Sequence, residues 1–223
     1  MSQKLVWVQF PPRPPSFFYV TMRGYFRNPK LNTDRNLQAY VIGIAIGDGN
    51  LSKPGPRAVR LRITCDKKYP KLLNRIVKSL KQLLPENRVG IVDRETLVDV
   101  SVYSNHLEGL LGWKANKGPK FIQKVRIPDW IKIDKSCTAS CLKGLLETDG
   151  SVYLDRGYRM VIFSTINVEL ANDTLLLFQS LGYKPHLYRI KQKKNRYGFA
   201  FKYHVRLSKN VDSFTDLIGV DKS

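Results

Sequence analysis

Two stretches of the sequence decide the fold, "YVIGIAIGDGN" at Tyr40–Asn50 and "CLKGLLETDGSVY" at Cys141–Tyr153. Each is an apolar, helix-like run that ends in Asp-Gly, so Asp48 and Asp149 stand at the carboxyl end of a helix. The carbonyl groups at that end carry partial negative charge, and an acid there costs up to about 1 kcal/mol. A single exposed carboxylate could explain one such end, but two matching ends indicate a shared role.

Small residues in the two runs predict how these helices pack. Gly43 and Gly47 lie four positions apart and share one face of the first helix, and Gly144 and Thr148 take the same places in the second. A glycine inside a helix costs about 1 kcal/mol relative to alanine. We therefore expect the two helices to pack backbone to backbone, which brings their acids together. Divalent cations such as Mg²⁺ would offset the repulsion between the two carboxylates.

Each acid is followed by a glycine, Gly49 or Gly150. Helices commonly end in a glycine with left-handed backbone angles, because that conformation caps the last carbonyl groups. We expect both glycines to adopt it.

The segments around the two runs repeat, which predicts a pseudo-two-fold α+β molecule. In the first unit we expect helices over 37–48, 69–84 and 104–112, and strands at 50–53, 58–64, 88–93 and 96–103. In the second unit we expect helices ending at 149, over 168–182 and near 209–218, and strands at 151–154, 159–165, 184–191 and 199–207. The domains are a basic, proline-rich extension (1–36), a first repeat (37–112), a linker (113–136) and a second repeat (137–223).

The charge of the chain points to a polyanionic partner. The 223 residues include 38 Lys and Arg against 18 Asp and Glu, for a formal net charge of +20. Such a balance fits nucleic acid first and an anionic membrane surface second. The longest apolar runs fall well short of the roughly 20 residues of a membrane span. Three cysteines at wide spacing do not suggest a disulfide framework, so a reducing, intracellular compartment is expected.

Two predicted strands alternate apolar residues with cations. Arg60 and Arg62 alternate with Val59, Leu61 and Ile63, and the last strand behaves alike. Since side chains of a strand point to opposite faces in turn, one face should pack on helices while the other binds nucleic acid. The cations expected to contact it are Lys53, Arg57, Arg60, Arg62, Arg94, Arg156, Arg159, Arg189, Lys191, Lys193, Lys194, Arg196, Lys202, His204 and Arg206.

Together these features resemble the LAGLIDADG homing endonucleases in their monomeric, two-repeat form. The family motif aligns with "VIGIAIGDG" (41–49) and "LKGLLETDG" (142–150), and the resemblance covers residues 37–222. It implies tandem αββαββα repeats with the motif helices paired at the centre. It also implies two antiparallel sheets that form a saddle over DNA.

The resemblance implies metal-dependent hydrolysis of double-stranded DNA at a long target site, leaving short 3′ overhangs. Asp48 and Asp149 would bind the metal, together with the preceding Gly47 and Thr148. Mg²⁺ is the expected cofactor, Mn²⁺ should replace it, and Ca²⁺ should bind without supporting cleavage. A monomer is expected, with no membrane partner and with its host intron RNA as a further partner.

The sequence also departs from the family pattern. The earlier acid of the motif is Ile46 in the first copy, so only Glu147 of the second copy could assist. Lys114 and Lys222 match the place of a lysine that members often carry after each repeat's last helix, and both are expected to be catalytic. The residue that positions water is left open, although Cys65 and Thr165 fall where the family often places it.

Three other functions use the same fold. DNA-binding regulators on this fold tend to lose the acids, so the retention of both favours the endonuclease, whereas RNA maturase activity could coexist with cleavage. An endonuclease embedded in an intein is the third alternative. Because the sequence starts at Met1 and ends in "VDKS", without a nucleophile at its start or a His-Asn pair at its end, a free-standing protein is favoured.

Overall fold

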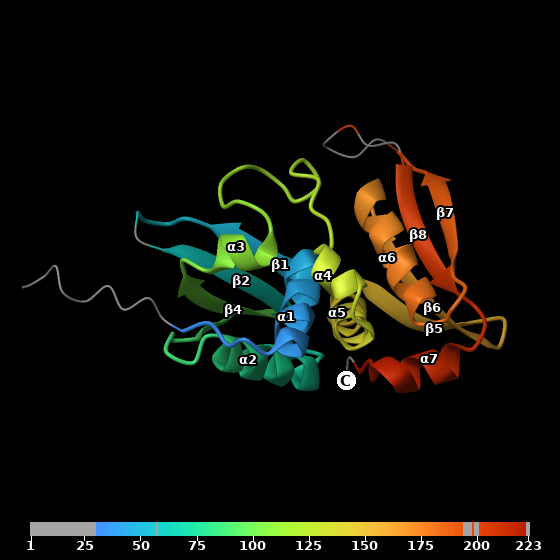
Figure 1. Ribbon diagram of the computed structural model, residues 1–223, viewed down its shortest axis with the longest axis horizontal. Helices are drawn as coiled ribbons and strands as arrows, with labels where there is room; N and C mark the ends of the chain where they lie inside the picture. The colour runs from blue at the N-terminus through green and yellow to red at the C-terminus, as the bar shows by residue number, and fades with distance from the viewer. Residues whose placement is uncertain (1–29, 57, 194–197, 199–200, 222–223) are drawn as a thin grey trace, which may run out of the picture.

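The protein folds into two repeats of one pattern (Figure 1), described by a computed structural model over residues 30–56, 58–193, 198 and 201–221. The first repeat contains α1 (Arg35–Asp48), β1 (Gly49–Ser52), β2 (Val59–Asp66), α2 (Pro70–Leu83), β3 (Gly90–Asp93), β4 (Leu97–Ser104) and α3 (Leu107–Leu111). The second contains α5 (Lys135–Thr148), β5 (Gly150–Asp155), β6 (Tyr158–Thr165), α6 (Val168–Ser180), β7 (His186–Lys191), β8 (Phe201–Leu207) and α7 (Val211–Ile218). This confirms the predicted α+β fold of tandem αββαββα repeats. The connecting segment adds a one-turn helix, α4 (Asp129–Lys132), which the sequence did not predict.

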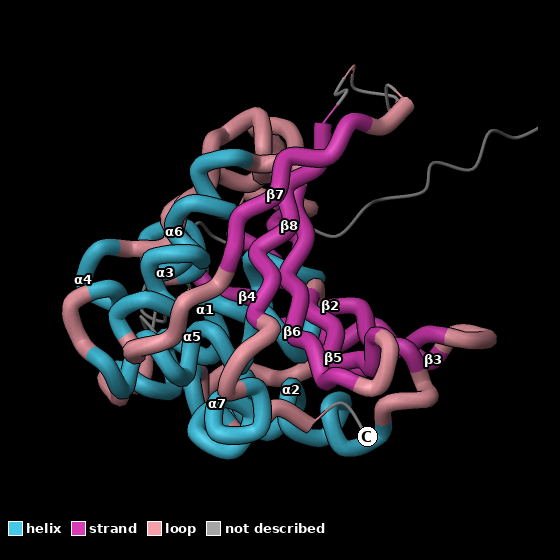
Figure 2. Tube along the Cα trace, turned by 90° about the vertical axis from the view of Figure 1, so that its right-hand side faces the viewer, coloured by secondary structure: helices cyan, strands magenta, loops and turns pink. Residues whose placement is uncertain are grey.

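Each repeat contributes one antiparallel sheet of four strands. The strand orders are β1-β2-β4-β3 and β5-β6-β8-β7, so the same topology occurs twice. Leu61 and Ile63 of β2 face Val102 and Val100 of β4, and all four side chains are buried beneath the helices. Figure 2 shows the helices gathered on one side and the strands on the other. The predicted alternation therefore places one face of each sheet in the core.

The two motif helices, α1 and α5, pack side by side at the centre of the molecule (Figure 1). Gly43 and Gly144 make this possible, because a Cβ atom on either would collide with the backbone of the other helix, at the carbonyl of Cys141 or of Tyr40. The predicted backbone-to-backbone packing is confirmed. Each helix also begins at an Asp, Asp34 or Asp134, whose carboxylate accepts hydrogen bonds from backbone amides of the first turn.

The glycines after the two acids do not adopt the left-handed conformation that we expected. Gly49 has φ −78° and ψ 145°, which is extended backbone, and Gly150 is likewise absent from the glycines with positive φ. Each glycine is the first residue of a strand, so α1 runs directly into β1 and only Asp149 separates α5 from β5. A Cβ atom on Gly49 would lie 2.5 Å from the Ala45 carbonyl oxygen, and one on Gly150 would lie 2.5 Å from Leu146 Cα. Lack of space, not left-handed geometry, is the reason for glycine here.

The segment between the repeats is held against the second repeat. Asp173 of α6 is fully buried and accepts hydrogen bonds from Arg126 Nη2 at 2.6 Å and from the Ile127 backbone amide at 3.0 Å. Lys132 Nζ lies 2.9 Å from the same carboxylate. The linker is therefore an ordered part of the fold. Within the described residues, none of the helices is long and apolar enough to cross a membrane.

Candidate active site

The two motif acids lie at the same end of the helix pair. Both side chains are exposed at the carboxyl ends of α1 and α5, where Gly47 packs against Thr148. The Cβ position of Gly47 lies 3.5 Å from Asp149 Oδ2, so a larger residue there would crowd the carboxylate. Both acids also act electrostatically on one lysine, Lys120. The predicted meeting of Asp48 and Asp149 thus has a structural basis.

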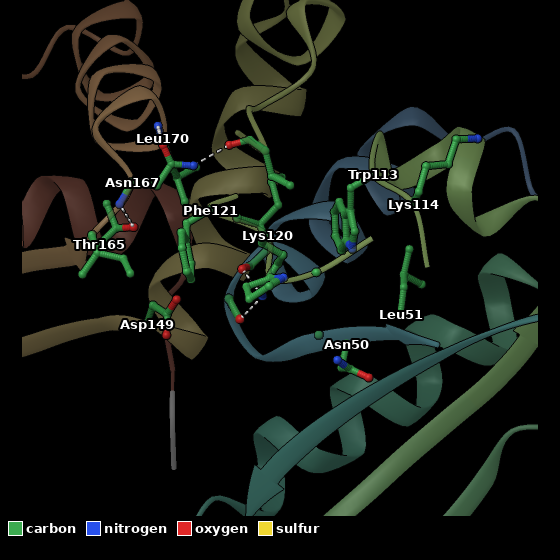
Figure 3. Close-up of a pocket in the computed structure, with 17 residues that line it drawn as sticks. Asn50, Leu51, Trp113, Lys114, Lys120, Phe121, Asp149, Thr165, Asn167 and Leu170 are labelled. Carbon is green, nitrogen blue, oxygen red and sulfur yellow. Dashed lines mark hydrogen bonds between the residues drawn. The ribbon is translucent and has the colours of Figure 1, made fainter. Parts of the chain in front are cut away.

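Lys120 from the linker lies at the end of α1 (Figure 3). Its Nζ donates a hydrogen bond to the Ala45 carbonyl oxygen at 3.2 Å and shorter ones to the carbonyls of Ile46 and Gly47. These carbonyls form the negative end of the helix dipole, which a cation offsets. Burial lowers the pKa of Lys120 to about 8, although the charges of Asp149 and Asp48 act in the opposite direction.

Sequence reasoning missed Lys120. Lysine is common in the linker, and neither helical nor strand periodicity distinguishes this one from Lys114, Lys117 or Lys124. Only the tertiary path of the linker brings it to the carbonyls of α1. Lys120 differs from these lysines in its position between Pro119 and Phe121, and those neighbours do not indicate a catalytic role.

A pocket of about 430 Å³ opens beside Lys120 and Asp149 (Figure 3). Its walls come from the end of α1, the start of β1, the linker and the start of α6, so both repeats contribute. Asn50 and Thr165 supply polar side chains to it.

Cys65 is not among the residues that line this pocket and is buried. Burial, followed by the charges of Asp48 and Asp66, raises the pKa of the Cys65 thiol to about 11, so this residue stays protonated. Of the two candidates for positioning water, Thr165 has the better location.

The other residues expected to take part in catalysis differ in their placement. Lys114 lines the pocket wall, but its amine contacts Glu108 Oε2 at 3.3 Å and points away from Asp149 in Figure 3. Glu147 is 1% exposed and contacts Tyr40 and Arg75 in the interface between the repeats. Lys222 lies outside the described residues.

The residues at the helix ends fit a hard divalent cation such as Mg²⁺. Mg²⁺ commonly uses one or two protein carboxylates and completes its shell with substrate phosphates and water. Among the described residues, no group of three or more His, Cys, Asp or Glu is placed so that it could hold a metal ion. The Thr148 hydroxyl donates back to the carbonyls of Gly144 and Leu145 at 3.0 Å, and the Gly47 carbonyl accepts from Lys120. The two carboxylates are therefore the stronger candidates of the four expected ligands.

Comparison with known proteins agrees with this architecture. Residues 136–219 match the family model of the LAGLIDADG-like domain. The second repeat thus matches this family in sequence, and the fold of the whole chain is that of a two-repeat LAGLIDADG protein. Its fold is similar to that of I-DmoI in complex with DNA and Mn, with a TM-score of 0.58 and 18% identity over 85% of this chain and 97% of that one.

Two further proteins are similar to this chain. The N-terminal LAGLIDADG domain of DUF199/WhiA matches 87% of this chain and 88% of its own, with a TM-score of 0.55 and 14% identity. A DNA polymerase from Thermococcus hydrothermalis is 28% identical over 193 residues, which are 80% of this chain. The chain spans 11% of the length of that polymerase.

The open sheet faces carry part of the expected cation set. Arg60 and Arg62 of β2 stand opposite Tyr103 and Ser101 of β4, on the face away from the core. Lys202, His204 and Arg206 occupy the corresponding face of β8, since Val205 and Leu207, which alternate with them, are buried. Arg94 follows β3, and the loop cations Lys53, Arg156 and Lys193 are exposed.

Other expected cations lie on the helix side of the second sheet. Arg189 and Lys191 stand opposite Tyr203 and Phe201, in phase with the buried Val205. Arg159 is in phase with the buried Val161 and forms an ion pair with Asp212 of α7. Alternation along one strand does not show which of its two faces is buried. That depends on the elements that pack against the strand. Arg57, Lys194 and Arg196 lie outside the described residues.

Proposed function

We propose that this LAGLIDADG protein is a site-specific, metal-dependent endonuclease that cuts double-stranded DNA as a single chain and leaves short 3′ overhangs. The observation that supports this proposal is the placement of two motif carboxylates and a buried lysine at one end of the helix pair. That end opens between two sheets whose outer faces carry cations. I-DmoI, which has the same fold, is known in complex with DNA and Mn and with DNA and Ca.

In this proposal Asp48 and Asp149 hold Mg²⁺, which Mn²⁺ can replace, while Ca²⁺ supports binding only. A bound divalent cation lowers the pKa of water and stabilises the leaving 3′-oxygen. Lys120 sits at the negative end of α1, where its charge offsets that of a phosphate in the transition state. Thr165 and Asn50 line the same pocket and can hydrogen-bond water there. Lys120 takes the role that the sequence assigned to Lys114.

The sheets would hold the DNA. Cations such as Arg60, Lys202 and Arg206 contact phosphates and fix the register of the duplex, while polar residues between them read base edges in the major groove. Because each repeat contributes a whole sheet, one chain covers both halves of a long target.

The test begins with selection of a cleaved site from a random DNA library in Mg²⁺. Asp48→Asn and Asp149→Asn are each expected to abolish cleavage of that site and to leave binding in Ca²⁺ largely intact. Asp66→Asn is the matched control, because Asp66 is an acid at the end of β2 that pairs with Lys68 instead. Undiminished cutting by either motif variant would refute the metal assignment.

A second candidate is a DNA-binding protein that does not cut, favoured by the likeness to the WhiA LAGLIDADG domain. It predicts selective, tight binding of one DNA sequence with no cleavage in Mg²⁺ or Mn²⁺. The comparisons give no support for intron RNA as a partner.

A further inference from the structure

We propose that Arg94, held by Asp99, reads a guanine next to the cleavage centre in the half of the DNA site that the first repeat covers. Arg94 is the specificity-determining residue in this proposal, and Asp99 is its positioning residue. The proposal rests on the DNA-binding function above and adds which residue selects which base.

The Asp99 carboxylate is almost fully engaged by its neighbours. Its Oδ2 accepts from Arg94 Nε at 2.7 Å and Nη2 at 2.6 Å, while its Oδ1 accepts from the Thr64 hydroxyl at 2.6 Å. The Asp99 side chain is 7% exposed, so solvent does not compete strongly for these bonds. Two bonds to one edge of the guanidinium fix both its position and its plane.

The same guanidinium remains accessible from outside. The Arg94 side chain is 55% exposed although its Nε and Nη2 are bound to Asp99. The edge opposite the carboxylate is thus presented to whatever lies on the sheet. A second cation, Arg62, has its Nη1 4.0 Å from Asp99 Oδ2, which adds positive charge beside Arg94.

This cluster belongs to the open face of the sheet. Thr64 and Asp99 are register partners on β2 and β4, and they are in phase with Arg62 and Ser101. The intervening Ile63 and Val100 are buried in the core. An occupant of the open face therefore meets Arg94 directly.

The cluster also lies at the inner end of the sheet. Gly49, which directly follows Asp48, is the register partner of Ile63, one residue before Thr64. Cys65, one residue after Thr64, is close enough to Asp48 for that charge to raise its pKa. The base that Arg94 meets should accordingly lie close to the scissile phosphates, not at the outer end of the target.

Guanine is the base that such an edge selects. An arginine pairs in a bidentate manner with O6 and N7 of guanine in the major groove, and a good pair of this kind discriminates by about 5- to 150-fold. A guanidinium already fixed by a carboxylate loses less conformational freedom on binding than a mobile one. An isolated, mobile arginine would instead contact phosphates without selecting a base.

The experiment measures DNA binding in Ca²⁺ for the wild-type chain, Arg94→Lys and Asp99→Asn. The DNA panel carries the selected target, base substitutions at each inner position, and 7-deazaguanine, which lacks N7, in place of each inner guanine. Arg126→Lys is the matched control, since Arg126 is also 55% exposed and bonds a buried acid, Asp173, at 2.6 Å on the helix side. Melting temperatures verify that each variant is folded. If Asp99→Asn does not fold, Arg94→Lys still tests the contact, because the Arg94 side chain is exposed.

The wild-type chain and Arg126→Lys are expected to bind about tenfold more weakly when one inner guanine is replaced by 7-deazaguanine. Arg94→Lys and Asp99→Asn should each bind the 7-deazaguanine target as tightly as they bind the guanine target. Because Asp99→Asn removes a negative charge, it should bind unrelated DNA at least as tightly as the wild type.

The inference is overturned if no inner guanine matters to the wild type, if Arg94→Lys keeps the discrimination, or if a folded Asp99→Asn weakens all sequences equally. Selective binding without cleavage would refute the endonuclease and leave the guanine contact standing. Cleavage that is indifferent to inner guanines would refute the guanine contact alone.

Discussion

The Tyr40 hydroxyl donates a 2.6 Å hydrogen bond to the Glu147 carboxylate, which ties α1 of the first repeat to the motif helix of the second. Arg75 of α2 reaches the same carboxylate at 3.0 Å, and the backbone amide of Asp221 lies at 3.4 Å. Burial raises the pKa of Glu147, while Tyr40, Arg75 and Lys143 act against that shift. This acid holds the repeats together, which differs from the assisting role that the motif alignment suggested.

Tyr40→Phe is expected to destabilise the protein by about 1–3 kcal/mol, because it removes a hydrogen bond from a buried carboxylate. Chemical denaturation measures the change in the free energy of unfolding. Tyr158→Phe is the control, since Tyr158 is 71% exposed and should leave stability unchanged. Equal stability of the two variants would show that the contact contributes nothing.

Gly43→Ala should lower both stability and cleavage. The added Cβ would strike the Cys141 carbonyl, so the helices must move apart, at a cost of about 1–3 kcal/mol. That movement also displaces Asp48 from Asp149. Gly109→Ala in α3 meets nothing within 4 Å and should stabilise by up to about 1 kcal/mol. Thermal or urea unfolding should show a loss of stability for Gly43→Ala and a gain for Gly109→Ala. Unchanged stability in Gly43→Ala would contradict the close packing of the helices.

Lys120→Met and Lys114→Met together decide which lysine serves the active site. Removing the buried Lys120 should slow cleavage about 10²–10³-fold, the usual effect of losing one charge-stabilising donor. Removing the exposed Lys114 should have a small effect, because its amine pairs with Glu108. Single-turnover cleavage in Mg²⁺ measures both rates. The reverse order of effects would return the role to Lys114.

Acid should destabilise the contact between the linker and α6. Burial opposes the charged form of Asp173, but hydrogen bonds from Arg126, Lys132 and Ile127 outweigh it, so its pKa lies below the usual value. A carboxyl with a lowered pKa in the folded state stabilises fully above its unfolded pKa of about 4, and that contribution is lost as the pH falls through the folded pKa. Melting temperatures should therefore fall more steeply below about pH 4 in the wild type than in Asp173→Asn. Parallel curves would rule out this residue as a source of acid sensitivity.

The sequence by itself determined the repeat order, the fold class and the pairing of the motif helices. These rest on local signals, namely the two Asp-Gly ends, the glycines at helical spacing and the alternation of strands, each of which depends on neighbours along the chain. Gly43 and Gly144 indicated a close approach, since few other reasons place glycine inside an apolar helix.

Tertiary structure alone decided which lysine meets the acids and which strand cations reach the open face. Lys120 reaches the carbonyls of α1 through the path of a linker with no periodicity, and Arg159 and Lys202 differ only in strand phase. The same is true of Glu147, whose partners come from α1 and α2, more than 70 residues away. Contacts between segments so distant in the chain depend on how the sheets and helices pack, which no local pattern encodes.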